Sequence, residues 1–61
     1  MSTLQSIRDA MAVLEMEDRK FVAGNSAAGT RARKALAELG KLAKARRNEI
    51  TDEKNARKEA K

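Results

Sequence analysis

The near absence of helix-breaking residues is the feature that most constrains what this chain can fold into. It has no proline, and only three of its 61 residues are glycine. Good helix formers predominate, and β-branched residues never alternate over the length of a strand. The one strong turn signal is Gly24-Asn25-Ser26. The sequence therefore predicts an all-α fold of two helices joined by one short turn.

Residues that favour helix ends occur at the expected boundaries. Ser2 or Thr3 can cap the first helix. Gly24 can take the left-handed conformation that stops a helix, and Asn25 or Ser26 can cap the second helix. Because the turn is short, we expect the two helices to be antiparallel neighbours.

These signals divide the chain into a hairpin and a tail. We expect the first helix over about 3–22, a turn over 23–25 and the second helix over about 26–50. Residues 1–50 then form the hairpin. The charged segment 51–61 has no large apolar residue, so we expect it to be frayed or disordered when free.

Each predicted helix carries a stripe of apolar residues at helical spacing. This face is too narrow to be well buried in a lone two-helix hairpin, and the chain has neither cysteine nor histidine for a disulfide or a zinc site. We therefore expect a homodimer or higher homo-oligomer, with two hairpins forming a four-helix bundle. The predicted core and oligomer interface consists of Leu4, Ile7, Met11, Leu14, Phe21, Leu36, Leu39, Leu42 and Ile50.

Two charged residues fall within the predicted apolar stripes. Asp18 lies opposite Arg31 when the helices are paired about the turn, which predicts an ion pair. Arg46 is expected beside Leu4, at the open end of the hairpin, with its methylenes over apolar neighbours and its guanidinium in water. The alternative for Arg46 is an acidic partner, either Asp9 or a carboxylate of another subunit.

The charge of the chain is concentrated in its second half. The net charge is +5, made up of −1 in residues 1–28 and +6 in residues 29–61. Such asymmetry indicates a polyanionic partner for the second helix, where most of the cations share an arc of about 100° opposite Leu39 or flank it. The predicted DNA-binding residues are Arg31, Arg33, Lys34, Lys41, Lys44 and Arg47.

The start of the second helix is a further candidate for binding an anion, because its backbone N–H groups are free and its side chains are small. Gly29 weakens the helix there. Its presence is explained either by close packing, against Phe21 or a neighbouring chain, or by close approach of a phosphate.

The residue types present favour phosphate contacts over base reading. Phe21 is the only aromatic residue and belongs to the apolar stripe, which disfavours stacking on single strands. Lys and Arg contacts to phosphates carry no sequence information directly. We therefore expect a protein that coats, bridges or compacts double-stranded DNA. RNA binding and a helical protein-interaction module are the alternatives, and an Ala-rich apolar face without Trp disfavours a membrane-surface helix.

Several function classes lack the residues they need. There is no His, Cys, Tyr or Trp and no glycine-rich phosphate loop, so we predict no enzyme, no cofactor, no metal and no small-molecule substrate. No run approaches a membrane span, and the first residues do not resemble a signal peptide. A cytoplasmic, nucleoid-associated protein is expected.

The segment around the turn resembles a known family. Residues 20–34, read as Lys-Phe-Val-Ala-Gly-Asn-Ser-Ala-Ala-Gly-Thr-Arg-Ala-Arg-Lys, are similar to the bacterial histone H1-like proteins, the family of the chlamydial histone-like protein. The resemblance continues weakly to Ile50. It implies nucleoid-associated DNA binding and compaction, without a winged-helix domain, and makes Arg31, Arg33 and Lys34 natural contact candidates. Arg46 departs from the apolar residue expected at its position.

Overall fold

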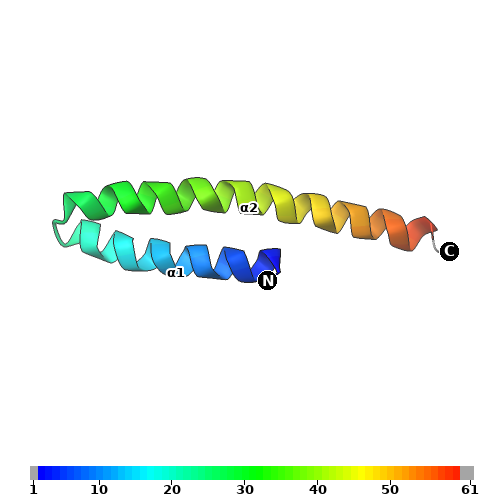
Figure 1. The fold of residues 1–61 in the computed structure, drawn as a ribbon, viewed down its shortest axis with the longest axis horizontal. Coiled ribbons are helices and arrows are strands. Elements are labelled where there is room, and N and C mark those ends of the chain that lie inside the picture. Colours follow the sequence, from blue (N-terminus) through cyan, green and yellow to red (C-terminus); the bar gives the residue numbers. More distant parts are fainter. Residues whose placement is uncertain (1, 60–61) are drawn as a thin grey trace.

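The computed structural model describes residues 2–59, which form two antiparallel helices lying side by side (Figure 1). Helix α1 spans Thr3–Val22 and helix α2 spans Ser26–Glu59. The molecule is a rod of 56 × 15 × 15 Å. No strand occurs in the described range. The prediction of an all-helical fold with two packed helices is confirmed.

The turn between the helices depends on Gly24. Its φ is +112°, a conformation that residues with a Cβ rarely adopt. The Gly24 N–H donates to the Phe21 carbonyl at 2.9 Å, and the Asn25 N–H donates to the Lys20 carbonyl at 3.0 Å. These two bonds form a Schellman motif, which satisfies carbonyl groups at the end of α1 and reverses the chain.

One of each pair of predicted capping residues makes the cap. At the start of α1, the Ser2 hydroxyl accepts a hydrogen bond from the Gln5 N–H at 3.1 Å. At the start of α2, the Asn25 side-chain oxygen accepts one from the Ala28 N–H at 3.2 Å. Each cap pairs a backbone donor that the helix itself leaves free.

Helix α2 is longer than the sequence pattern predicted. It continues through Ile50, where we expected it to end, and reaches Glu59, so its last part projects past the start of α1 (Figure 1). We call residues 51–59 the overhang. The overhang contains no glycine or proline, and a 2.9 Å ion pair between Arg57 and Glu53, one turn apart, supports the helix there. The described residues 51–59 are therefore helical in the structure, and their fraying in the free chain stays a prediction.

The two helices meet along a seam of buried and half-buried residues, most of them spaced by three or four positions. On α1 the seam consists of Thr3, Ser6, Ile7, Ala10, Leu14 and Glu17. On α2 it consists of Ala28, Gly29, Ala32, Ala35, Leu39, Leu42 and Arg46. Small side chains dominate near the turn, which lets the backbones approach closely.

Close packing at that end also explains Gly29. A Cβ built on Gly29 would lie 2.7 Å and 2.9 Å from two carbons of the Phe21 ring. The sequence left two explanations for Gly29, close packing and the approach of a phosphate. The contact with Phe21 supports close packing. Gly40 differs, because a Cβ there would meet no atom within 4 Å.

The predicted apolar core divides between the seam and an exposed flank. Ile7, Leu14, Leu39 and Leu42 are half-buried in the seam. The other five predicted core residues are between 44% and 54% exposed, and we call them the apolar flank: Leu4, Met11, Phe21, Leu36 and Ile50. These five are thus exposed in a single hairpin, and their place in an oligomer interface stays a prediction. Next to Leu4, Met11 and Leu36, the smaller residues Thr3, Ala10 and Ala35 face the partner helix instead.

The interior of the hairpin is correspondingly thin. Among the described residues, the buried apolar side chains are the alanines Ala28, Ala32 and Ala35, and no large side chain is fully buried. Alanine contributes little apolar area when it is buried. The hairpin alone therefore has a weak hydrophobic core, and most of its larger apolar side chains remain about half exposed to solvent.

Candidate nucleic-acid interface

Four cations along the seam and its edges are paired with carboxylates. Arg31 and Lys20 both lie against Glu17, with Lys20 at 3.5 Å. Arg46 pairs with Glu49 at 2.9 Å, and Arg57 with Glu53 at the same distance. Cations held in this way are partly neutralised, so they are poorer phosphate ligands than unpaired ones.

Glu17 is the one buried charged residue in the described part of the chain, with 3% of its surface exposed. The Arg31 guanidinium donates a hydrogen bond to its Oε2, while Oε1 accepts none. This hydrogen bond, aided by the charges of Arg31 and Lys20, lowers the pKa of Glu17 below its ordinary value despite desolvation. The carboxylate is thus ionised at neutral pH, and the hydrogen bond from Arg31 offsets the cost of burying its charge.

The predicted ion pair between Asp18 and Arg31 is wrong by one residue. Arg31 pairs with Glu17 instead, and Asp18 is exposed. Both residues lie three or four positions from the seam residue Leu14, so helical periodicity could not separate them. The signal that the sequence offered was that Glu17 is also one turn from Lys20.

Arg46 is half-buried at the open end of the hairpin, as its place on the seam predicted. Its partner is Glu49 on the same helix rather than Asp9, which accepts from Gln5 instead. The Thr3 hydroxyl donates to Glu49, and this bond, followed by that from Arg46, lowers the pKa of the Glu49 carboxyl. Glu49 thus joins the start of α1 to α2.

The outward side of α2 has a different composition. Three rows of residues, each spaced by seven, run along it without an acidic residue between positions 30 and 58. Glu49 and Glu53 instead follow the seam residues of α2 at the same spacing of three or four positions. Glu38 and Asp52 lie seven and twenty-one positions after Arg31, along the edge of the seam. The cations of α2 are therefore sorted by position, paired near the seam and unpaired outside it.

Five predicted DNA-binding residues lie on this outward side, and we call them the basic face. All are exposed, and none forms an ion pair with a carboxylate among the described side chains. They are Arg33, Lys34, Lys41, Lys44 and Arg47. The sixth predicted residue, Arg31, is half-exposed but bound to Glu17, so the structure separates it from the other five.

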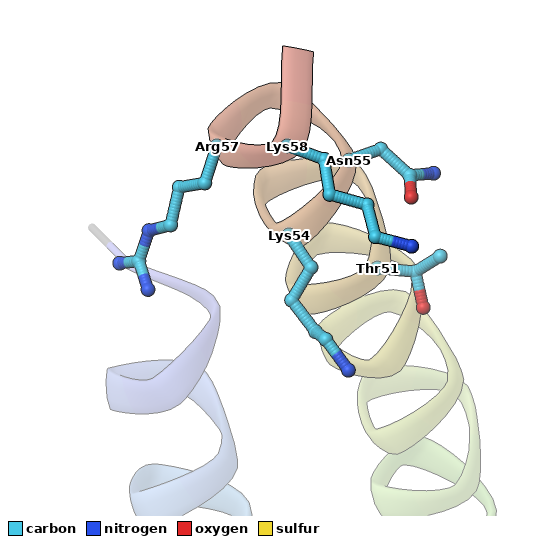
Figure 2. Close-up of a pocket in the computed structure, with 5 residues that line it drawn as sticks. All are labelled: Thr51, Lys54, Asn55, Arg57 and Lys58. Carbon is cyan, nitrogen blue, oxygen red and sulfur yellow. The ribbon is translucent and has the colours of Figure 1, made fainter. Parts of the chain in front are cut away.

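The overhang continues the basic face with two residues that our sequence analysis did not include. Lys54 follows Arg47 by seven positions and Lys58 follows Lys44 by fourteen, a repeat that was readable in the sequence. These distal lysines line a shallow groove with Thr51, Asn55 and Arg57. Figure 2 shows Thr51, Asn55 and Lys58 on one side of the helix and Arg57 pointing away from them.

The arrangement supplies charge and hydrogen-bond donors rather than reactive groups. The described residues contain no cluster of acidic side chains able to hold a metal ion. The exposed residues of α1 include the acids Asp9, Glu15 and Asp18, which balance its exposed cations Arg8 and Arg19, so an approaching polyanion meets unbalanced positive charge on α2 and not on α1. Such a surface can bind phosphates electrostatically.

Comparison with known proteins identifies the family. The model of the family described as Histone H1-like protein Hc1 matches residues 1–56. The chain belongs to this family. It is a family of structural DNA-binding proteins of the nucleoid, so the predicted resemblance is confirmed. The corresponding searches of curated proteins and of solved structures found no match.

This histone H1-like chain has a surface of the kind its family membership leads one to expect. DNA is the partner that the family implies, and a basic helix side without acids is suited to it. No helix in residues 2–59 has the length and apolarity needed to cross a bilayer.

Proposed function

We propose that this protein binds double-stranded DNA without reading its sequence, through the basic face of α2. The observation that carries the proposal is the sorting of charge along α2: five exposed cations without carboxylate partners lie on a side that has no acidic residue. Each bound phosphate releases counterions, which supplies the free energy of binding. No aromatic side chain lies on the basic face to stack on a base.

Charge reversal on the basic face tests the proposal. Lys34→Glu combined with Lys41→Glu should abolish binding to a duplex while leaving the helicity unchanged, because both residues are exposed on α2 and neither belongs to the buried or half-buried seam. The matched control is Arg8→Glu with Arg19→Glu, which changes the net charge equally but on exposed positions of α1. We expect the control to retain most of the affinity. Equal losses in the two variants would mean that only net charge matters.

The salt dependence of binding provides a second test. Five phosphate contacts give a log–log slope of about −4.5, and any further contact makes it steeper. We expect the same affinity for duplexes of unrelated sequence. A slope near zero, or a hundredfold preference for one sequence, is incompatible with binding through phosphates alone. Equal affinity for duplex RNA would favour the alternative that RNA is the ligand.

We also propose that the hairpin assembles into a homodimer through the apolar flank. Its residues carry five exposed large apolar side chains, and the hairpin has a thin core of its own. Packing two flanks together would form a four-helix bundle and leave a basic face on each chain, so that one dimer could bridge two duplexes and compact DNA. The same flank favours the second candidate function, docking on the helices of another protein.

A further inference from the structure

The unpaired cations on the outward side of α2 occur in three groups. Arg33 and Lys34 form the first group, and the distal lysines Lys54 and Lys58 form the last. The central group consists of Lys41, Lys44 and Arg47. On the outward side of α2, Ala37, Gly40, Asn48 and Thr51 separate the groups. Among the described side chains, none of these cations pairs with a carboxylate.

The groups are regularly spaced along the helix axis. At 1.5 Å per residue, the centre of the central group lies about 16 Å from the first and about 18 Å from the last. The two outer groups are therefore about 34 Å apart. One turn of B-form DNA measures about 34–36 Å, so a line parallel to the duplex axis meets the same strand again after that distance.

From this match we propose that α2 lies along the axis of a B-form duplex, with its first cation pair and its distal lysines bound to phosphates one helical turn apart. The central group then contacts the strand that crosses between them. This inference rests on the proposed DNA-binding function and adds the overhang to the binding site. It also assigns a role to the helical extension, which projects past the start of α1 (Figure 1).

The alternative orientation leaves the outer groups unused. A straight helix placed across a duplex diverges from its convex surface on both sides, so only the central group would reach phosphates. Asn55, between the distal lysines, suits a phosphate backbone, because its side-chain amide carries a hydrogen-bond donor on the same side as Lys58 (Figure 2). A-form RNA has different groove dimensions, so the spacing favours DNA.

The first test removes the distal charges. Lys54→Gln with Lys58→Gln should reduce the salt slope by about 2 and the affinity roughly tenfold to thirtyfold near 0.15 M salt, on a duplex of about 16 base pairs. On a duplex of about 8 base pairs, roughly 27 Å long, the variant and the wild type should bind alike, because only two groups fit. An unchanged affinity for the longer duplex would overturn the inference.

The second test changes the spacing and keeps the charge. Seven helix-forming residues inserted between Ile50 and Thr51 keep the distal lysines on the same side and move them by about 10.5 Å. The control carries the same seven residues between Lys58 and Glu59. Circular dichroism verifies that both variants remain helical.

We expect the inserted variant to bind the longer duplex as weakly as the variant with two glutamines, and the control to bind it like the wild type. Full affinity of the inserted variant would refute the one-turn spacing. The same loss on duplex RNA would refute the assignment to B-form DNA. If the wild type binds neither duplex length, the proposed function itself fails, a result distinct from failure of the orientation.

Discussion

At the scale of single residues, Glu17 and Arg31 show how packing changes the role of a cation. Arg31 belongs by sequence to the basic segment of α2, but its guanidinium is held by a carboxylate that the seam buries. A buried charge without its partner is costly, so Arg31 is needed where it is. We therefore expect Arg31 to stabilise the hairpin and to contribute little to DNA binding.

A pair of substitutions separates these two roles. Arg31→Met should lower the melting temperature by several degrees, because Glu17 is left without its hydrogen-bond donor, and should leave the salt slope of DNA binding nearly unchanged. Lys34→Met should do the reverse, reducing the slope by about 0.9 without affecting stability. Thermal unfolding and a salt titration measure the two effects. A shallower salt slope for the Arg31 variant would mean that Arg31 contacts a phosphate after all.

The pH dependence of stability follows from the lowered pKa of two carboxyls. Hydrogen bonds from Arg31 to Glu17, and from Thr3 and Arg46 to Glu49, keep both ionised in the folded chain. Since the pKa is lower in the folded state, this stabilisation is complete above the ordinary value of 4.5 and is lost as the pH falls through the folded pKa.

We therefore expect the melting temperature to fall as the pH decreases below about 4.5. Glu17→Gln should flatten this dependence, because the substituted side chain does not titrate. Thermal unfolding between pH 7 and pH 3 measures the effect. An equally steep decrease in the glutamine variant would assign the dependence to other carboxyls.

At the scale of helices, α2 contains two glycines whose surroundings differ. Gly29 faces the Phe21 ring, and an added Cβ would lie within 3 Å of it. Gly40 is exposed, and an added Cβ would meet nothing. In the interior of a helix, glycine destabilises by about 0.5–1 kcal/mol relative to alanine. Packing therefore explains one glycine, and nothing within the chain explains the other.

Alanine substitutions make this difference measurable. Gly40→Ala should raise the free energy of unfolding by about 0.5–1 kcal/mol. Gly29→Ala gains the same helix propensity but must displace the Phe21 ring, so we expect a net loss of stability. Chemical denaturation of the two variants beside the wild type compares them. If both alanines stabilise equally, the contact between Gly29 and Phe21 does not constrain the hairpin.

At the scale of the whole molecule, the rod has a charged side and an apolar side. The basic face lies outward on α2, while the apolar flank borders the seam and includes residues of both helices. A groove on this flank is lined by Phe21, Leu36 and Asp18 among others, which places apolar residues of α1 and α2 side by side. Arg33 of the basic face lines the same groove, so the two surfaces border each other there, whereas the other four residues of the basic face do not line it.

Substitutions on the flank and in the seam test this separation. Leu36, 54% exposed, should serve the dimer alone, so Leu36→Ser should yield a folded monomer of 6.7 kDa with weakened bridging of duplexes. Leu39 lies in the seam, so Leu39→Asp should unfold the hairpin as well, since a buried charge is costly. Light scattering and circular dichroism distinguish the outcomes. A monomeric wild type at micromolar concentration would refute the dimer and the bridging.

Local chemistry made the two helices and their turn readable from the sequence. Gly24 and the capping residues act on backbone groups within a few positions, and the absence of proline lets each helix continue. The basic face was readable for a related reason, because helical periodicity alone decides which residues of one helix share a side. The same repeat extended beyond Ile50 would also have found the distal lysines.

The choice of the residues that face the partner helix depended on the tertiary structure. Apolar periodicity favoured Leu4, Met11 and Asp18 on α1, whereas Thr3, Ala10 and Glu17 face α2. Hydrophobicity could not decide between stripes one residue apart. Close approach of the backbones determined which stripe faces the partner helix. The small alanines and Gly29 near the turn allow this approach, and one ion pair fits at the same end of the seam. Only that packing revealed that Arg31 is held by Glu17 and that the larger apolar residues remain exposed.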